Sequence, residues 1–170
     1  VPTTVLSQVD SSVGGKVAID MGSYKNIVGA FWQPKTVIID PNVLSTLSLR
    51  QQHNGLCEAL KMGLILDDHL VSLFEQETLD IDAIITRSIE LKRDVVQQDE
   101  RESNLRKILN FGHTIGHAIE SAYGLNTYLH GECVAMGMLF FIEDETLKQR
   151  VLNIYKKLDL PQVPDYDTAT

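Results

Sequence analysis

NLRKILNFGHTIGHAIESAY, residues 104–123, is the segment with the clearest structural pattern in this chain. Its polar residues recur at steps of four, three, four and three, which on one helix would share a single face: Arg106, Asn110, His113, His117 and Glu120. Apolar residues fill the opposite side. Solvated helix faces usually carry Glu and Lys rather than paired His, so we expect this face to line a functional site.

Helical spacing continues on both sides of this segment. The apolar periodicity predicts helices over 55–75, 80–101, 104–123, 131–145 and 146–158. The first fifty residues instead carry turn signals at their glycines and one short buried strand over Thr36–Asp40. We therefore expect a mainly α, multihelical fold with a short β segment near the N-terminus.

The domain organisation follows from the same change of pattern. We expect one structural domain, with a connecting segment over 1–50, a helical region over 51–160 and a loose tail over 161–170. The chain starts at Val1 without an initiator Met and stops after Thr170 with no structural signal for an end. We expect it to be a piece of a longer protein.

Composition excludes several classes of protein. With 170 residues, of which 44% are hydrophobic, the chain is a globular domain rather than a disordered or fibrous one. A net charge of −8 has the wrong sign for electrostatic binding of nucleic acid. The chain has no run of eighteen apolar residues and no signal peptide, so we expect a soluble, cytoplasmic protein with no membrane contact. We interpret Cys57 and Cys133 as reduced core residues.

Several residues have the character of metal ligands. His113 and His117 stand four residues apart, but Thr114 occupies the position of the acid in an HExxH helix, so the pair alone is a weak signal. His130 adds a third imidazole. Glu58 lies among apolar neighbours, where a carboxylate is usually paired, protonated or metal-bound. Two His and one Glu suit a zinc site with an open position, and spacing alone leaves open which of these residues meet.

A second group of residues is cationic. Lys92 falls in the middle of the apolar stripe of 80–101, where it needs a counter-charge or an anionic ligand, and Asp99 on the same face is a possible partner. Further cations stand beside glycines, asparagine or apolar residues: Lys16, Lys25, Lys61 and Arg106. Together they suggest a local pocket for an anion.

Taken in order, these motifs resemble those of the 3-dehydroquinate synthase family. They are Thr3-Thr4, DSSVGGK at 10–16, Lys25-Asn26, EALK at 58–61, LNFGHT at 109–114, GHA at 116–118 and HGE at 130–132. The resemblance implies the helical metal and substrate half of a two-domain enzyme. The family's other half is an α/β dinucleotide-binding domain, which this sequence does not contain.

The resemblance also implies an activity. The family converts 3-deoxy-D-arabino-heptulosonate 7-phosphate to 3-dehydroquinate and phosphate, in the shikimate pathway that leads to chorismate and the aromatic amino acids. It uses transient oxidation by NAD, elimination of phosphate, re-reduction and an intramolecular aldol cyclisation. The implied cofactors are NAD and Zn²⁺ or Co²⁺, and the implied partners are a small phosphorylated sugar acid, the missing NAD-binding domain and a second copy in a homodimer. We expect this chain to be inactive alone, because hydride then has no acceptor.

Residue roles transfer by matching positions. The resemblance implies Glu58, His113 and His130 as metal ligands, and His117, Lys61, Lys92 and Asp10 as catalytic residues. Implied substrate-binding residues are Lys16, Lys92, Arg106, Asn110 and His117. Implied cofactor-binding residues are Thr3, Thr4, Asp10, Lys16, Lys25, Asn26, Val43, Leu44, Ser45 and Thr46.

Three alternatives remain open. Another sugar-phosphate cyclase that uses NAD and zinc would share most of these motifs. A metal-dependent hydrolase could use the same two His and one Glu without a redox step, although the chain has neither HExxH nor a His-Asp dipeptide. A folded piece with only a structural role would bind neither metal nor substrate.

Overall fold

The computed structural model describes residues 1–22, 24–124 and 127–164, without the side chains of residues 20, 24 and 25. The expected mainly α fold with a short β segment is confirmed. In the described part the α-helices are α1 Leu49–Leu66, α2 Asp68–Glu75, α3 Ile81–Gln98, α4 His113–Tyr123, α5 His130–Leu139 and α6 Glu145–Lys157. The shorter elements are η1 Ser7–Ser11, β1 Lys16–Met21, β2 Tyr24–Phe31, η2 Pro41–Thr46 and η3 Leu105–Asn110.

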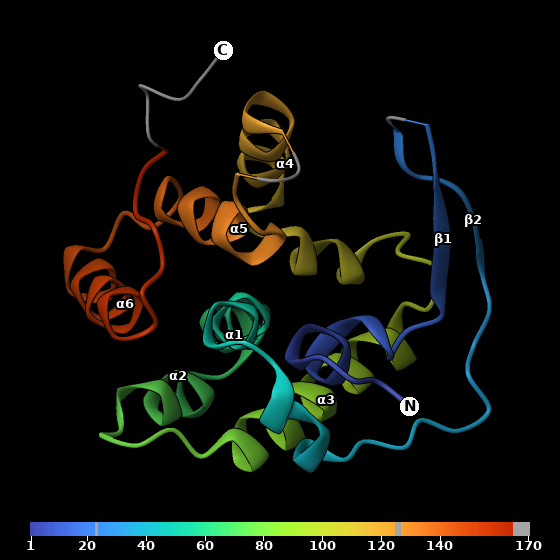
Figure 1. Cartoon of the computed structure of the whole chain (residues 1–170), viewed down its shortest axis with the longest axis horizontal. Coiled ribbons are helices and arrows are strands. Elements are labelled where there is room, and N and C mark those ends of the chain that lie inside the picture. Colours follow the sequence, from blue (N-terminus) through green and yellow to red (C-terminus); the bar gives the residue numbers. More distant parts are fainter. Residues whose placement is uncertain (23, 125–126, 165–170) are drawn as a thin grey trace.

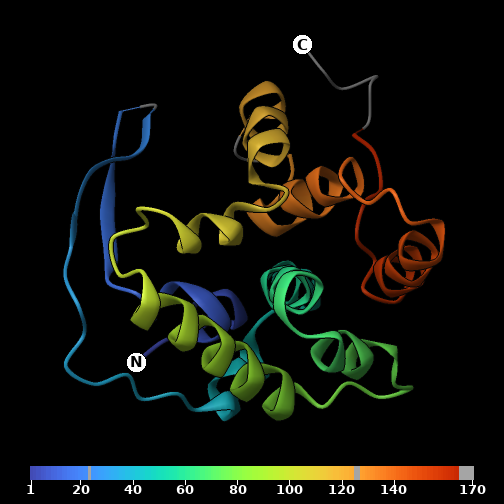
Figure 2. The ribbon, with the colours of Figure 1, turned by 180° about the vertical axis from the view of Figure 1, so that it is seen from behind.

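Helix α1 lies at the centre of the molecule. Every residue from Asn54 to Gly63 is buried, because other elements cover this helix on all sides. Helices α2 and α3 lie on one side of it and α4, α5 and α6 on the other, while the β1–β2 hairpin stands at the edge (Figures 1 and 2). Helix α6 joins α5 through the Tyr155 hydroxyl, which donates to the Ala135 carbonyl at 2.7 Å. The side chains on the middle of α1 therefore face the interior of the fold.

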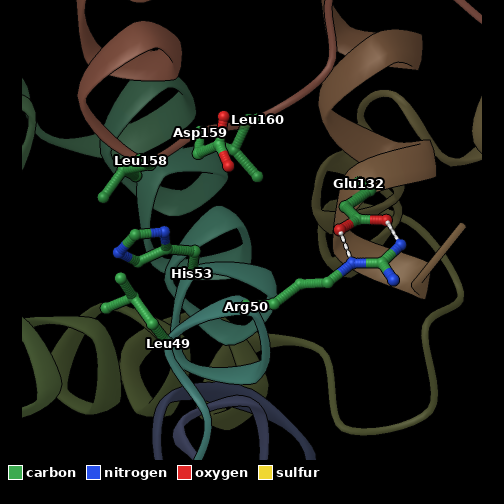
Figure 3. Close-up of a pocket in the computed structure, with 7 residues that line it drawn as sticks. All are labelled: Leu49, Arg50, His53, Glu132, Leu158, Asp159 and Leu160. Atoms are coloured by element: carbon green, nitrogen blue, oxygen red, sulfur yellow. Dashed lines mark hydrogen bonds and ion pairs between the residues drawn. The ribbon is translucent and has the colours of Figure 1, made fainter.

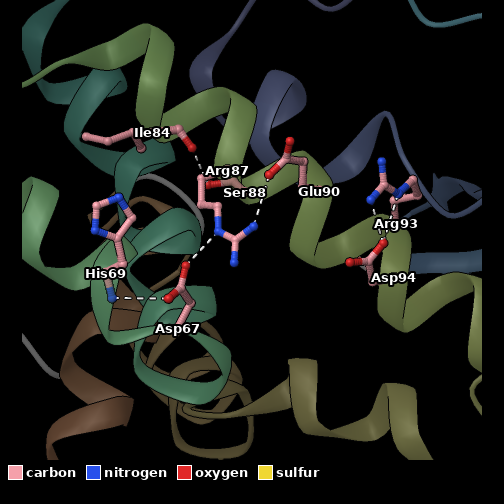
Figure 4. Close-up of polar contacts among 8 residues, drawn as sticks. All are labelled: Asp67, His69, Ile84, Arg87, Ser88, Glu90, Arg93 and Asp94. Atoms are coloured by element: carbon pink, nitrogen blue, oxygen red, sulfur yellow. Dashed lines mark hydrogen bonds and ion pairs between the residues drawn. The ribbon is translucent and has the colours of Figure 1, made fainter.

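The predicted helix over 55–75 is wrong as one element, because the chain turns at Asp67. The Asp67 backbone is extended, and its carboxylate accepts from the His69 N–H at 3.1 Å as the N-cap of α2. The same carboxylate accepts from Arg87 Nε of α3 at 2.6 Å (Figure 4). This ion pair ties α3 to the corner between α1 and α2.

The predicted helix over 104–123 is also wrong as one element. The 3₁₀ turn η3 ends at Asn110, and α4 begins at His113 after Gly112, whose φ of 76° is left-handed. A Cβ at Gly112 would lie 2.5 Å from Met138 of α5, and one at Gly137 would lie 2.1 Å from the Gly112 carbonyl oxygen. The close approach of α5 thus fixes the break, and Arg106 and Asn110 do not continue the face of α4.

The β structure differs from the expected strand. Residues Thr36–Asp40 have no strand pairing, and the described sheet consists of antiparallel β1 and β2 with Lys16 opposite Phe31. A short apolar run becomes a strand only beside a partner, and residues 32–40 instead cross the surface toward η2 (Figure 1). The hairpin exposes many large apolar side chains: Val17, Ile19, Met21, Ile27, Val28 and Phe31.

The remaining helices match the predicted ones except at their ends. Helix α3 stops at Gln98, and α5 stops at Leu139 rather than continuing to residue 145. Asp144 then caps α6 by accepting from the Leu147 N–H at 2.7 Å. Both cysteines are buried and form no disulfide within the described residues, in agreement with the predicted reduced core residues. Among the described residues no helix is long and apolar enough to cross a membrane, and the predicted loose tail falls from residue 165 onward outside the described residues.

Candidate metal and substrate site

Glu58 and Lys61 form a buried ion pair on the central helix. The side chains are 1% and 2% exposed, and Lys61 Nζ contacts Glu58 Oε2 one turn along α1. The other carboxylate oxygen, Oε1, is buried and has no hydrogen-bond partner among the described residues. A buried carboxylate oxygen without a donor is costly, so this atom marks a place for a further ligand.

Two imidazoles face that oxygen. His113 Nε2 of α4 lies 3.6 Å from Glu58 Oε1, and His130 Nε2 of α5 lies 3.5 Å from it. Zinc bonds of 2.0–2.1 Å to a tetrahedral set of N and O ligands separate neighbouring ligand atoms by about 3.3 Å. We call these three residues the Glu58 cluster; their ligand atoms all lie within 4.8 Å of one another, which fits one zinc-sized ion.

The protonation states of Glu58 and His113 suit a metal, whereas Glu58 raises the pKa of His130, from which a metal would displace a proton. Burial opposes the charge of Glu58, but Lys61 and the two imidazoles outweigh it and hold the pKa of Glu58 well below its usual range. Burial also lowers the pKa of His113. His113 Nδ1 lies 3.1 Å from the Phe111 carbonyl, which can only accept, so the proton sits on Nδ1 and the Nε2 lone pair faces Glu58. An ionised carboxylate and a neutral imidazole are what a divalent metal requires.

Contacts at the start of α5 place His130 relative to α1. The Gly131 N–H donates to Asn54 Oδ1 at 2.6 Å, and a Cβ at Gly131 would collide with the Asn54 carbonyl. Glu132 accepts from Arg50 Nε at 2.6 Å beside a surface pocket between α1 and the residues after α6 (Figure 3). These contacts lie one to two turns before Glu58 on α1, so they set the distance from His130 to the carboxylate.

His117 lies beside the Glu58 cluster but outside it. Its ring centroid is 5.4 Å from that of His113 and 5.8 Å from that of His130. It belongs to a second group of possible metal ligands, with Glu120 and His130. The i, i+4 spacing of His113 and His117 therefore does not bring both imidazoles to Glu58.

Lys92 pairs with Asp10 rather than with Asp99, so the partner suggested by the helix face is wrong. Lys92 is 5% exposed, and its Nζ lies 2.8 Å from Asp10 Oδ1 and 2.5 Å from the Asp10 carbonyl oxygen. Burial lowers the pKa of Lys92, and the Asp10 carboxylate only partly offsets this effect. Asp99 instead accepts from the backbone N–H groups of 103, 104 and 106 and so shapes the start of η3.

Arg106 is buried against Gly14 of the N-terminal segment. Its Nη1 donates to the Glu100 carbonyl at 2.6 Å, and the residue is 2% exposed. Gly14 has φ of 102°, and a Cβ there would lie 2.3 Å from Arg106 Nη2. Glycine at this position lets the guanidinium lie against the backbone.

Lys16 and Asn110 meet a carboxylate that the sequence analysis missed. Glu102 contacts Lys16 Nζ, and Asn110 Nδ2 donates to Glu102 Oε1 at 2.8 Å. These contacts lower the pKa of Glu102 against the effect of burial. Glu102 lies in an irregular segment with φ of 58°, where no periodicity assigns a face, so no sequence signal marked it.

The predicted cofactor-binding residues all lie within the first 46 residues and belong to several elements. Thr4 bonds to Ser7 at the start of η1, and Val43, Leu44, Ser45 and Thr46 belong to η2. Lys25 and Asn26 belong to β2, at the end of the hairpin opposite η2 (Figures 1 and 2); the Lys25 side chain lies outside the described residues.

Comparison with solved structures supports the same architecture. A 2-epi-5-epi-valiolone synthase from Streptomyces hygroscopicus, solved with NAD⁺ and Zn²⁺ bound, matches with a TM-score of 0.86 and 29% identity, over 96% of this chain and 50% of that one. A 2-deoxy-scyllo-inosose synthase complexed with carbaglucose-6-phosphate, NAD⁺ and Co²⁺ matches with a TM-score of 0.82 and 30% identity, over 99% and 51%.

Sequence comparison gives the family. The model for the C-terminal part of 3-dehydroquinate synthase matches residues 55–168, and that for the N-terminal part matches residues 1–54. The 3-dehydroquinate synthase of Caldanaerobacter subterraneus subsp. tengcongensis is 49% identical over 98% of this chain, and that of Geotalea uraniireducens is 47% identical over 95%. The chain spans about half the length of these curated relatives. It belongs to the 3-dehydroquinate synthase family.

Proposed function

We propose that this chain is the metal- and substrate-binding half of a 3-dehydroquinate synthase, a lyase of the shikimate pathway. The full enzyme would convert 3-deoxy-D-arabino-heptulosonate 7-phosphate to 3-dehydroquinate and phosphate. The observation that carries the proposal is the convergence of Glu58, His113 and His130 from three helices, with the buried cations Lys61 and Lys92 on the adjoining helix faces. Zinc or cobalt held by the Glu58 cluster would polarise the reacting hydroxyl and favour its loss of a proton.

The arrangement of cations supports a substrate that is anionic at both ends. Lys92 and Arg106 are buried cations suited to a hydroxyl and a carboxylate. Lys16, Asn110 and His117 would hold the phosphate. In this structure Glu102 engages Lys16 and Asn110, so a phosphate that used the same donors would displace its carboxylate.

The chain's own groups would also handle protons. Burial opposes the charge on Lys61, but Glu58 and Asp10 raise its pKa overall, so Nζ stays protonated and can donate to a substrate oxygen. Asp10 would accept from a substrate hydroxyl while holding Lys92. His117 stands at the rim of the Glu58 cluster, where its imidazole can carry a proton between substrate and solvent.

We also propose that the rest of the enzyme supplies most of the NAD site. NAD would accept hydride from the substrate and return it within one turnover. The exposed apolar side chains of the hairpin support packing against a further part of the enzyme or a second copy in a homodimer. We propose that residues 1–50 connect to the cofactor side, 51–160 bind metal and substrate, and 161–170 form a loose tail.

Reconstitution tests this proposal. The purified chain would be mixed with the separately expressed N-terminal half of a close relative, NAD and Zn²⁺, and phosphate release from 3-deoxy-D-arabino-heptulosonate 7-phosphate would be measured. We expect release only in the mixture. Rapid phosphate release by the chain alone, without NAD, would support a metal-dependent hydrolase instead.

The second candidate is another NAD- and zinc-dependent cyclase, which the two solved structures favour. Arg106 discriminates between the candidates, because a sugar phosphate without a carboxylate has no group that needs a buried guanidinium. The same mixture supplied with glucose 6-phosphate is therefore expected to remain inactive. Turnover of that sugar in preference to the heptulosonate would overturn the assignment of substrate.

A further inference from the structure

The two ring nitrogens of His130 face two different carboxylates. Nε2 lies 3.5 Å from Glu58 Oε1, and Nδ1 lies 3.8 Å from Glu120 Oε2. Glu120 belongs to α4 and is only 7% exposed, although it was expected on a solvated or ligand-lining face. A carboxylate that is buried against an imidazole must offset its loss of water by contacts inside the protein.

The chemistry of a metal-bound imidazole suggests a role for Glu120 as a hydrogen-bond acceptor. A histidine that binds metal through Nε2 carries its remaining proton on Nδ1, and that N–H needs an acceptor. For His113 the acceptor is the Phe111 carbonyl. For His130, the carboxylate of Glu120 faces Nδ1 and can act as the acceptor.

We propose that Glu120 is a positioning residue for His130, which it holds in the Nδ1–H form with Nε2 directed at the metal. This inference rests on the proposed metal site at the Glu58 cluster and adds a residue from outside that ligand set. The negative charge of Glu120 also makes the imidazole a stronger electron donor, as carboxylates do behind zinc-bound histidines. Because Glu120 and His113 share α4, one helix both supplies a ligand and orients another.

A competing role for Glu120 is direct metal binding. Glu120, His117 and His130 also have potential ligand atoms within 4.8 Å of one another. If Glu58 and Glu120 each held an ion, His130 would have to bind both through its two nitrogens and lose both ring protons. If His130 binds a single ion through Nε2, it keeps one ring proton on Nδ1 and the second deprotonation is not needed. The positioning role of Glu120 is therefore favoured.

Zinc affinity of the chain tests the proposal. Competition with a chromophoric chelator would give the Kd for Zn²⁺ of the wild type, Glu120→Gln and Glu120→Ala. We expect about one zinc per chain in all three, with Kd weakened about 10- to 100-fold in Glu120→Ala. Glu120→Gln, which keeps an acceptor oxygen without its charge, should show a smaller loss.

A matched control and a second measurement separate this role from a general loss of structure. Asp67→Asn removes a partly buried carboxylate nine residues along the chain from Glu58, whose partner is Arg87 of α3; it should lower stability but leave the Kd for zinc within about twofold. In the metal-free chain, ¹⁵N shifts of His130 should report a larger share of protonated Nδ1 in the wild type than in Glu120→Ala, because Nδ1 faces the Glu120 carboxylate.

Two results would overturn the positioning role. One is an unchanged zinc Kd and an unchanged His130 tautomer in Glu120→Ala. The other is two zinc ions in the wild type and one in Glu120→Ala, which would make Glu120 a ligand. A wild type that binds no zinc while its His130 tautomer still depends on Glu120 would instead refute the proposed metal site.

Discussion

Replacing Lys61 with Met in the metal-free chain is expected to destabilise the fold strongly at pH 7. The substitution keeps the length of the side chain but leaves Glu58, which is 1% exposed, without its ammonium partner. Loss of one partner of a buried ion pair typically costs about 3–5 kcal/mol of unfolding free energy. The variant therefore tests whether the buried pair holds the centre of α1 together before metal binds.

Protonation of Glu58 sets an upper limit on the loss of unfolding free energy in Lys61→Met. The folded variant can take up a proton at Glu58 and so avoid a buried unpaired charge. An ordinary glutamate pKa is 4.5, so protonation at pH 7 spans about 2.5 pH units at about 1.36 kcal/mol each, or about 3.4 kcal/mol. At pH 5 the same step costs only about 0.7 kcal/mol. In the wild type the pKa of Glu58 is lowered, so its stabilising effect is present above the unfolded pKa and is lost as pH falls toward the folded one.

Urea unfolding followed by circular dichroism, with a chelator present, would measure these differences. At about 2 kcal/mol per M, the midpoint of Lys61→Met should fall by about 1.5 M at pH 7 and by much less at pH 5. Lys156→Met is the control, since Lys156 is exposed and its loss should change stability by less than about 0.5 kcal/mol. The double variant Glu58→Gln/Lys61→Met should recover most of the loss.

Either of two outcomes would refute this expected role of the Glu58–Lys61 pair. A loss below about 1 kcal/mol at pH 7 would mean that the pair is solvated rather than buried. A loss that is as large at pH 5 as at pH 7 would mean that packing of the lysine stem, and not the charge of Glu58, causes the effect.

Two further pairs of variants probe the site and the fold. Glu58→Gln should abolish binding of Zn²⁺ measured by metal analysis, whereas His117→Ala should retain about one zinc per chain; the reverse pattern would refute the ligand assignment. Gly112→Ala should cost about 2–4 kcal/mol in thermal or urea unfolding, because a left-handed φ is combined with a Cβ 2.5 Å from Met138. Gly124→Ala, with a similar φ of 74° and no atom of the described residues within 4 Å of the new Cβ, should cost only about 1 kcal/mol, and equal losses would contradict the contact with α5.

Sequence periodicity predicted the helical class and most helices, because it reports which side chains are apolar and how they are spaced. It failed at Gly112 and Asp67, where the pattern continues but the chain bends. The bend at Gly112 follows from the approach of α5, and the bend at Asp67 from capping and an ion pair to α3. Neither the approach of α5 nor the Arg87 pairing is visible within one helical window.

In the candidate site, too, the sequence predicted the character of single residues better than their partners. The apolar surroundings of Glu58 predicted that its carboxylate is paired, protonated or metal-bound, and the structure shows it paired with Lys61. The partner of Lys92 was predicted on its own helix and lies 82 residues away, at Asp10. Spacing finds partners within an element, whereas partners from remote segments depend on the fold or on resemblance to a family.

The close backbone contact between α4 and α5 has a consequence for how such a site can diverge. With Gly112, Gly116 and Gly137 at the contact, the two helices form one mechanical unit that carries all three imidazoles of the region. Glu58 belongs to α1, which meets that unit at the close approach of Gly131 to the Asn54 backbone. Substitutions that alter this approach would change the distance from carboxylate to imidazole while the distances between imidazoles stay constant. We therefore expect relatives of this chain to differ in site geometry mainly through the seating of α1.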